Sequence, residues 1–395
     1  MASPQEEPLQ GQFGKYRIVR RIASGGMADI FLAVLDGPDG FFKTCVIKRI
    51  LPEYANLDVF SKMFAGEAKV AALLNHPNIV QVFDFGKIDG QYYLAMEWIQ
   101  GASLDKVVKR AAKAQVPLGP RMAVNVGIAL AEALAYAHQK TLPDGTPLKL
   151  VHRDITPGNV LVSREGQIKL ADFGIVKSSA NLERTAVGVV KGKYAYMSPE
   201  QIANRDLDFR SDLFSLGIVI WELITGKHLF KRDTLQQTIL AISRAEIPAP
   251  TSINPECPPA LEQAVHKLLA VTPEARYPSA SELHADLEQL RASQQWTSGG
   301  REIGLMMVKL FPVDASEVLP TPIPSLDLVG TGKAPSNPSL DVTVDTEAAT
   351  MDEERSSQLS NPQAAMAPPQ SRIPWLLVAA VGAAILGTIL FWSIT

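Results

Sequence analysis

The chain has 395 residues, of which 46% are hydrophobic and 20% are charged. This composition suits a globular protein of two or three domains and excludes a wholly disordered one. The 38 basic and 41 acidic residues give a net charge of −3, so no basic excess points to nucleic acid as a partner. Its two cysteines, Cys45 and Cys257, exclude a disulfide framework and a four-thiolate zinc site, and they favour a reducing compartment.

Alternating apolar residues predict a small N-terminal lobe over residues 13–98, after a flexible, polar stretch at residues 1–12. We expect five short strands and one helix there, because runs of period 2 are interrupted once by a helical pattern with an apolar face. The expected strands span 16–23, 30–35, 45–49, 79–85 and 92–98, and the expected helix spans 59–74.

Helical patterns dominate residues 99–295 and predict a larger second lobe. The expected helices span 122–139, 213–225, 259–269 and 279–290. The segment 213–225 is almost wholly apolar, but its 13 residues are too few for a bilayer, which needs about 20, so a buried helix is predicted. Residues 296–311 are predicted to add a short amphipathic extension of one or two turns.

The last part of the chain changes character twice. Residues 312–373 are acidic and rich in Pro, Ser and Thr, which predicts an extended linker. The uncharged run from Trp375 to Ile394 is 20 residues long and predicts one transmembrane helix over 374–395. Ala379, Ala383 and Gly387 form a small-residue face that predicts a homodimer, although an ordinary lipid-facing helix fits the same spacing.

Three features of the first lobe fit a site that holds phosphates. Ser24, Gly25 and Gly26 form a turn where backbone amides can approach an anion, because side chains are small or absent. Lys48 ends an apolar strand, and Glu67, 19 residues later, lies on the predicted helix where it can aim that lysine. Taken singly, these features also fit a hairpin turn, a solvated edge lysine and a surface charge.

The second lobe supplies a more specific pattern. Asp154 is followed five residues later by Asn159, and Asp172 comes 13 residues after Asn159 in the triplet Asp-Phe-Gly. This spacing offers one carboxylate for a substrate hydroxyl, and an amide oxygen and a second carboxylate as hard ligands for Mg²⁺. Phosphoryl transfer needs these groups, because it depends on positioning and on charge stabilisation.

With these motifs, the chain resembles the eukaryotic-like (Hanks-type) serine/threonine protein kinases of bacteria, most of all those of myxobacteria. The resemblance covers residues 13–290 and includes SPE at 198–200, DFRSD at 208–212, and Arg276, which that family pairs with Glu200. It implies an α+β, bilobal protein-kinase fold with N-lobe 13–98 and C-lobe 99–295, and Asp212 would hold the catalytic-loop backbone.

The same resemblance implies a function in bacterial signal transduction. The enzyme would transfer the γ-phosphate of ATP, bound with Mg²⁺ or Mn²⁺, to serine or threonine of protein substrates, and would autophosphorylate. The predicted helix would anchor it in lipid as a single-pass protein of the inner membrane, with the kinase domain in the cytoplasm. Arg372 before the span and the lack of a signal sequence agree with this orientation.

The resemblance also implies residue roles. Lys48 would pair with Glu67 and position the phosphates, Asp154 would orient or deprotonate the hydroxyl, and Asn159 and Asp172 would bind the metal. Met96 would be the gatekeeper beside the adenine-binding hinge, residues 97–99. The implied nucleotide-binding residues are Ile22, Ala23, Ser24, Gly25, Gly26, Ile30, Val46, Lys48, Glu67, Met96, Glu97, Ile99 and Leu161.

Several positions depart from the family pattern. Ala23 and Ala28 replace two glycines of the phosphate loop, which restricts the backbone. Thr156 stands where serine/threonine kinases usually carry Lys, and Lys193 stands where they usually carry Thr. We predict a functional exchange, in which Lys193 reaches Asp154 and the γ-phosphate while Thr156 supplies the hydroxyl. The alternative is that Lys193 is solvated and Thr156 weakens the enzyme.

Three further alternatives stay open at this level. A pseudokinase would use the fold for binding alone, and a small-molecule kinase would share only the catalytic core. Arg153, beside Asp154, predicts activation by a phosphate on Ser178, Ser179 or Thr185, because a buried guanidinium needs an anion. A carboxylate such as Glu183 would satisfy the same guanidinium without any phosphate.

Overall fold

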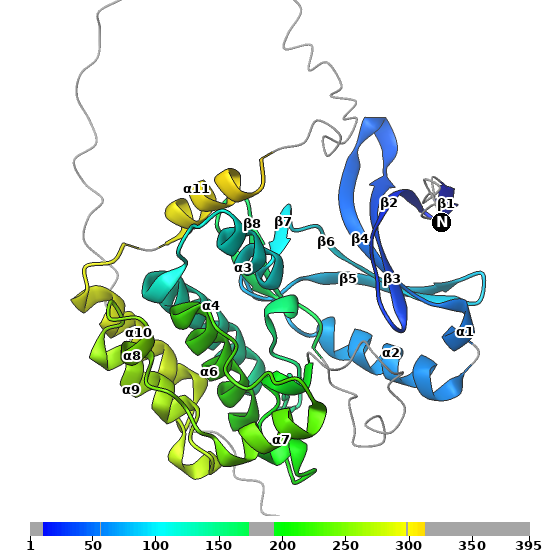
Figure 1. Cartoon of the computed structure of the whole chain (residues 1–395). Helices are drawn as coiled ribbons and strands as arrows, with labels where there is room; N and C mark the ends of the chain where they lie inside the picture. The colour runs from blue at the N-terminus through cyan, green and yellow to red at the C-terminus, as the bar shows by residue number, and fades with distance from the viewer. Residues whose placement is uncertain (1–10, 56, 174–192, 298, 313–395) are drawn as a thin grey trace, which may run out of the picture. The chain divides into compact units, whose positions relative to one another are not determined.

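The computed structural model describes residues 11–55, 57–173, 193–297 and 299–312 (Figure 1). All of them lie in the first of two compact units, residues 1–326. Within this unit a small lobe built on one sheet is followed by a larger helical lobe, as predicted (Figure 1).

The small lobe is a six-stranded antiparallel sheet in the order β1-β2-β3-β4-β6-β5. The strands are β1 (Gly11–Phe13), β2 (Tyr16–Ser24), β3 (Ala28–Asp36), β4 (Phe42–Ile50), β5 (Val82–Ile88) and β6 (Gln91–Glu97). Two helices accompany them, α1 (Pro52–Ala55) and α2 (Asp58–Ala71).

Alternation along the strands gives the sheet two apolar faces. On β6, Tyr93 and Ala95 pack in one cluster with Tyr16 and Ile47, whereas Leu94 packs in another with Phe64 of α2. Successive side chains of a strand point to opposite faces, so a period-2 run serves both clusters. The sheet is thereby fixed against α2, which carries Glu67 toward the site.

Two details of the small lobe differ from the sequence-based expectation. The structure has a sixth strand, β1, paired with β2 through Gly11 opposite Ile18, so the stretch expected to be flexible at 1–12 ends in a strand. Residues 79–81 do not belong to β5, because Ile79 forms an isolated bridge to Leu170 of the larger lobe, in which the Val80 N–H donates to the Leu170 carbonyl and the Leu170 N–H donates to the Asn78 carbonyl. An apolar run cannot show whether its backbone partner is the nearest strand or a distant one.

The larger lobe packs its helices around α4 and α6. Its helices are α3 (Leu104–Lys113), α4 (Gly119–His138), α5 (Pro199–Ile202), α6 (Arg210–Thr225), α7 (Leu235–Arg244), α8 (Pro250–Ile253), α9 (Pro259–Leu268), α10 (Ala280–Ser293) and α11 (Gly300–Leu310). A Cβ on Gly127 would lie 2.8 Å from Leu287 and 3.1 Å from Ile220, so α4 approaches α10 and α6 closely there. The four predicted helices of this lobe are confirmed as α4, α6, α9 and α10.

Helix α11 is longer than the one or two turns expected, and it is part of the larger lobe. Its 11 residues place Ile303, Met307 and Leu310 in the same core as α4 and α6. At Gly166, where φ is +86°, an added Cβ would lie 1.8 Å from the carbonyl oxygen of Gly300, so only glycine permits this contact. Among the described helices, none is both long and apolar enough to cross a membrane, and residues 374–395 lie outside the described part.

A small second sheet packs against helices α3, α4 and α11 of the larger lobe. It consists of β7 (Gly101–Ser103), β8 (Val160–Ser163) and β9 (Ile168–Leu170) in that order, all antiparallel. Residues 152–159 precede β8 and Asp172 follows β9, so this sheet places both chemical motifs beside each other. The backbone of β9 also bonds with residues 78–80, which ties the site to the small lobe.

Candidate active site

Lys48, in the small lobe, contacts two carboxylates, one from each lobe. Its position on β4, opposite Leu94 of β6, lets Nζ lie 2.8 Å from Glu67 Oε1 on α2 and 2.8 Å from Asp172 Oδ1. Burial lowers the pKa of Lys48, but Asp172 and Glu67 outweigh burial, and the pKa lies above the ordinary lysine value. The lysine is therefore a permanent cation held between an α2 carboxylate and the segment after β9.

Asp172 is an anion in an unusual backbone conformation. Burial raises its pKa, but the nearby Lys48 ammonium outweighs that effect and holds the pKa below the ordinary value. Its φ of 56° lies in the left-handed region, which non-glycine residues adopt at a cost. The surrounding contacts thus hold a charged carboxylate at a fixed place beside Lys48 and near Asp154.

Asp154 and Asn159 are locked together by the short η2 turn (Pro157–Asn159). Asn159 Nδ2 donates to the Asp154 carbonyl oxygen at 2.8 Å and to Asp154 Oδ2 at 2.9 Å. Because both bonds use the amide nitrogen, the amide oxygen of Asn159 is directed elsewhere. That oxygen and the Asp172 carboxylate are hard ligands, and two such ligands together with phosphate oxygens suit Mg²⁺. The donor set therefore fits the predicted metal.

The loop around Asp154 is held by buried Asp212, which is 1% exposed. Asp212 accepts hydrogen bonds from the backbone N–H of His152 at 2.8 Å and of Arg153 at 2.9 Å, and its Oδ2 lies 2.9 Å from His138 Nε2. A buried carboxylate needs such partners, and here they fix a loop in which Arg153 has φ 66°. The predicted contact of Asp212 with the loop backbone is confirmed.

Lys193 contacts the same carboxylate oxygen of Asp154 as Asn159 does. It begins the turn η4 (Lys193–Tyr196), and its Nζ lies 3.1 Å from Asp154 Oδ2. The ammonium is half exposed, whereas the Asp154 carboxylate is only 10% exposed. Within the described part of the chain, the Thr156 hydroxyl makes no hydrogen bond, so the Thr156 part of the exchange stays a prediction.

The predicted nucleotide-binding residues come from both lobes. Ile22, Ala23 and Ser24 end β2, and the following turn is closed by the Gly25 N–H, which donates to the Ala28 carbonyl at 2.9 Å. Ile30, Val46 and Met96 lie on the next three strands of the sheet, and Leu161 lies on β8. The structure thus brings the turn, the sheet and β8 into one compact unit, while Gly26 and Ile99 lie in the connecting segments.

The structure adds a contact that the sequence patterns missed. Glu97 Oε1, in the predicted hinge, accepts from Lys169 Nζ of β9 at 2.7 Å and from the Gln81 N–H at 2.8 Å. Lys169 is 9% exposed and lies three residues before Asp172, so the pair links the hinge to the strand that positions Asp172. No sequence signal indicates this pairing, because the two residues are 72 positions apart.

Two more predictions concern the segment after Asp172. Glu200 and Arg276 form the expected buried pair, with N–O distances of 2.6 and 2.8 Å. The Nε of Arg153 is buried and has no hydrogen-bond partner among the atoms that the structure describes. The candidate phosphosites Ser178, Ser179 and Thr185 and the alternative Glu183 lie outside the described residues.

These features define a bilobal phosphotransferase site, with a lysine–glutamate pair, an aspartate in a fixed loop, and an Asn/Asp pair suited to a divalent cation. A family model described as the protein kinase domain matches residues 16–287. The chain belongs to the protein kinase family.

Two curated relatives are bacterial kinases. The chain is 39% identical over 300 residues to tyrosine-protein kinase MasK of Myxococcus xanthus, an alignment that covers 76% of this chain and 46% of MasK. It is 36% identical over 278 residues to serine/threonine-protein kinase PrkC of Bacillus subtilis, covering 70% of this chain and 40% of PrkC. The chain thus spans less than half the length of both.

Solved structures agree with the assignment. The kinase domain of PknI from Mycobacterium tuberculosis matches with a TM-score of 0.55 and 27% sequence identity. The match covers 72% of this chain and 98% of that domain. The similarity therefore extends over a whole kinase domain.

Proposed function

We propose that this protein is an ATP-dependent serine/threonine protein kinase that transfers the γ-phosphate of ATP to protein substrates. The observation that carries the proposal is the joint placement of Lys48 between Glu67 and Asp172, beside Asp154 and Asn159. Each of these groups has a use in phosphoryl transfer, and a binding scaffold needs none of them in this arrangement.

Each of these side chains would have its own role in binding ATP or in transferring the phosphoryl group. Lys48 would hold the α- and β-phosphates, since Glu67 keeps its ammonium aimed into the cleft. Asp154 would accept the proton of the substrate hydroxyl. The hydroxyl oxygen would form a bond to the γ-phosphorus while the bond between the γ-phosphorus and the β–γ bridging oxygen breaks, and ADP would leave. Lys193 would lie beside Asp154 and stabilise the charge on the transferring group. A bound Mg²⁺ would neutralise phosphate charge when held by Asn159 and Asp172.

The alanines of the phosphate loop do not argue for a pseudokinase. Ala23 pairs with Ile30, just after a shift in the β2–β3 register, and Ala28 pairs with Ile50, so both positions lie in strands rather than in the turn itself. The turn keeps Gly25 and Gly26, where backbone amides can approach an anion.

Tyrosine is the second candidate acceptor. One relative is named a tyrosine-protein kinase, and Thr156 departs from the lysine usual in serine/threonine kinases. We favour serine and threonine because Lys193 supplies the missing ammonium at Asp154. Acceptor identity is read directly from the phosphorylated residues in the experiment below.

We expect the full chain, incubated with Mg·ATP and casein, to phosphorylate casein and itself on serine and threonine. Asp154→Asn should reduce both activities by at least 10³-fold, because the hydroxyl then lacks a base. Nucleotide binding, measured by calorimetry, should be retained. Mass spectrometry of the wild-type chain should find phosphate between residues 175 and 198, where it would satisfy Arg153.

Three outcomes would contradict parts of this proposal. Nucleotide binding without any transfer by the wild-type chain would identify a pseudokinase. Phosphate on tyrosine alone would establish the second acceptor class. Transfer to free small molecules but not to proteins would indicate a small-molecule kinase.

We further propose that residues 312–373 form a linker and that 374–395 anchor the enzyme in the inner membrane, with the kinase domain in the cytoplasm. The uncharged run of 20 residues supports the anchor. The full chain should sediment with membranes and be released by detergent but not by 1 M salt, whereas a chain without 374–395 should stay in the supernatant. A full chain found in the soluble fraction without detergent would contradict the anchor.

The proposed homodimer has its own readout. Ala379, Ala383 and Gly387 would pack two spans, so replacing them with isoleucine should abolish crosslinking between chains in detergent. A wild-type span that is monomeric in detergent would contradict the dimer.

A further inference from the structure

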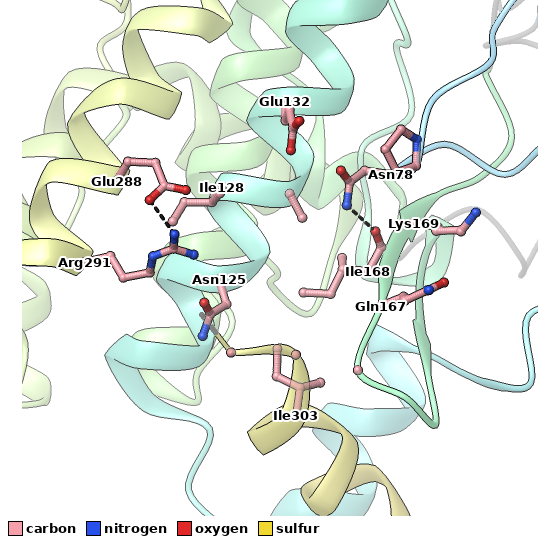
Figure 2. Close-up of a pocket in the computed structure, with 15 residues that line it drawn as sticks. Asn78, Asn125, Ile128, Glu132, Gln167, Ile168, Lys169, Glu288, Arg291 and Ile303 are labelled. Atoms are coloured by element: carbon pink, nitrogen blue, oxygen red, sulfur yellow. Dashed lines mark hydrogen bonds and ion pairs between the residues drawn. The ribbon is translucent and has the colours of Figure 1, made fainter. Parts of the chain in front are cut away.

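A cavity of about 400 Å³ lies in the larger lobe, and it is lined by none of the residues assigned above to nucleotide, metal or phosphoryl transfer (Figure 2). One wall is a single face of α4, since Asn125, Ile128, Ala129 and Glu132 follow helical spacing. The other walls come from the β8–β9 turn, α10 and the start of α11. Its volume lies within the range of ligand pockets, roughly 300–1,000 Å³.

Asn125 is a polar group at one end of this wall. The residue is only 9% exposed, and its side chain makes no hydrogen bond within the described part of the chain. Its amide atoms are not among the buried polar atoms that lack a partner, so they face the cavity and are available to a ligand. Gly299 leaves room for it, since a Cβ there would lie 2.2 Å from Asn125 Nδ2. The unpaired amide lines the cavity and is suited to a ligand that both donates and accepts.

Glu132 provides an uncompensated negative charge at the other end of the wall. Its side chain is half exposed, and among the described residues it pairs only with His76, at 3.8 Å. Burial lowers the pKa of His76, Glu132 only partly opposes this, and Lys169 adds to it, so the imidazole is neutral at pH 7. The two cations that line the cavity are occupied, Arg291 by Glu288 at 2.6 Å and Lys169 by Glu97 at 2.7 Å.

The distance between Asn125 and Glu132 along α4 matches the length of a short extended peptide. Asn125 and Glu132 are seven residues apart on α4, which is roughly 10 Å along the axis at 1.5 Å per residue. An extended chain covers that span with about three residues at 3.3 Å each. The apolar side chains of Ile128, Ile168 and Ile303 also line the cavity and can pack against a peptide side chain (Figure 2).

We propose that this cavity is a docking site for a short extended peptide segment of a protein substrate, with a peptide group on the Asn125 amide and an arginine or lysine on Glu132. A carboxamide pairs with a backbone peptide group through one donor and one acceptor. A basic side chain gives Glu132 the charge-assisted bond that His76 does not supply. The identification of the partner as a substrate rests on the proposed kinase function, whereas the binding itself does not.

The test uses the full chain in mild detergent, without ATP. The probes are fluorescein-labelled heptapeptides with a fixed central Arg, citrulline or Glu and randomised flanking positions, and binding is measured by fluorescence anisotropy. We expect the Arg library to bind at least tenfold more tightly than the Glu library. Citrulline keeps the shape of arginine without its charge, so it should bind at an intermediate level.

Variants assign the binding to the cavity. Glu132→Gln should remove the preference for Arg over citrulline, and Asn125→Ala should weaken all three libraries about tenfold. Glu256→Gln, an exposed glutamate outside the cavity, is the matched control and should bind like the wild type. Thermal unfolding checks each variant, and Asn125→Ala should not unfold earlier than wild type because no hydrogen bond is lost.

Several results would overturn the proposal. These are equal binding of the Arg and Glu libraries, no effect of Glu132→Gln and Asn125→Ala, or binding of free arginine amide as tight as that of the Arg library, which would indicate a small-molecule site. The Asp154→Asn chain should bind the peptides like the wild type. Loss of docking and loss of phosphoryl transfer are therefore separate outcomes.

Discussion

Lys193→Met should lower the rate of phosphoryl transfer by about 10²–10³-fold, the loss that follows removal of one stabilising donor from a transition state. The Lys193 ammonium lies 3.1 Å from Asp154 Oδ2, so it is placed to stabilise the transferring phosphoryl group. The double variant Thr156→Lys with Lys193→Thr should recover much of the lost rate, because it restores one ammonium and one hydroxyl around the same carboxylate. The measurement is kcat on casein for all four combinations of the two sites.

The control is Lys227→Met, which removes an exposed lysine two residues after the end of α6 and should leave the rate unchanged. Full activity of Lys193→Met would show that its contact with Asp154 has no catalytic role. Equal losses in the single and double variants would show that Thr156 and Lys193 do not exchange roles. Because Lys193 begins a turn that follows residues 174–192, the exchange would also make catalysis depend on the position of that segment.

Arg276→Met should lower the free energy of unfolding by about 3–5 kcal/mol, the cost of removing one partner of a buried ion pair. The Arg276 side chain is 0% exposed, and all five of its N–H groups are used. They donate to both oxygens of Glu200 and to the carbonyls of Arg210, Ala270 and Val271. Methionine would leave the Glu200 carboxylate buried without its cation. Urea unfolding of the two chains measures the difference.

Arg17→Met is the matched control for this loss. Arg17 pairs with Asp36 at 2.9 Å, but both side chains are about half exposed, so water replaces the lost partner. We expect this variant to unfold close to the wild type. A loss for Arg276→Met no greater than that for Arg17→Met would mean that the buried pair contributes little to the lobe.

The reacting and metal-binding residues could be predicted from the sequence, because phosphoryl transfer requires particular residue types at a particular spacing. Asp154, Asn159 and Asp172 fall within 19 residues of one another, and their loop is short enough for spacing alone to indicate a shared site. The long helices were also readable, because a buried face repeats every three to four residues over many turns. Strand β1 was missed because three residues give no period, whereas α3 and α7 were missed although each carries an apolar face over ten residues, as Leu104, Val107 and Ala111 do in α3.

Contacts between distant residues depended on the tertiary structure. Lys48 contacts Asp172, which is 124 residues away in the sequence, and Glu97 contacts Lys169, which is 72 residues away. No local sequence pattern predicts which distant residue such a side chain will contact. The sequence named Lys48 and Asp172 because their roles constrain their residue types. It gave no reason to select Lys169 or Asn125, because the roles we assign to them depend on residues of other helices and strands that lie near them only in the folded protein.

The sequence by itself thus determined the two lobes, their main helices and the identity of the reacting groups, because periodicity and chemistry act locally along the chain. Only the tertiary structure decided that α11 completes the larger lobe, that Lys193 lies beside Asp154, and that a cavity behind β9 holds an unpaired amide. These depend on how close two elements come, as at Gly166 and Gly300, where a single added carbon would separate them. Close packing fixes such distances, and it is a property of the assembled fold rather than of any segment.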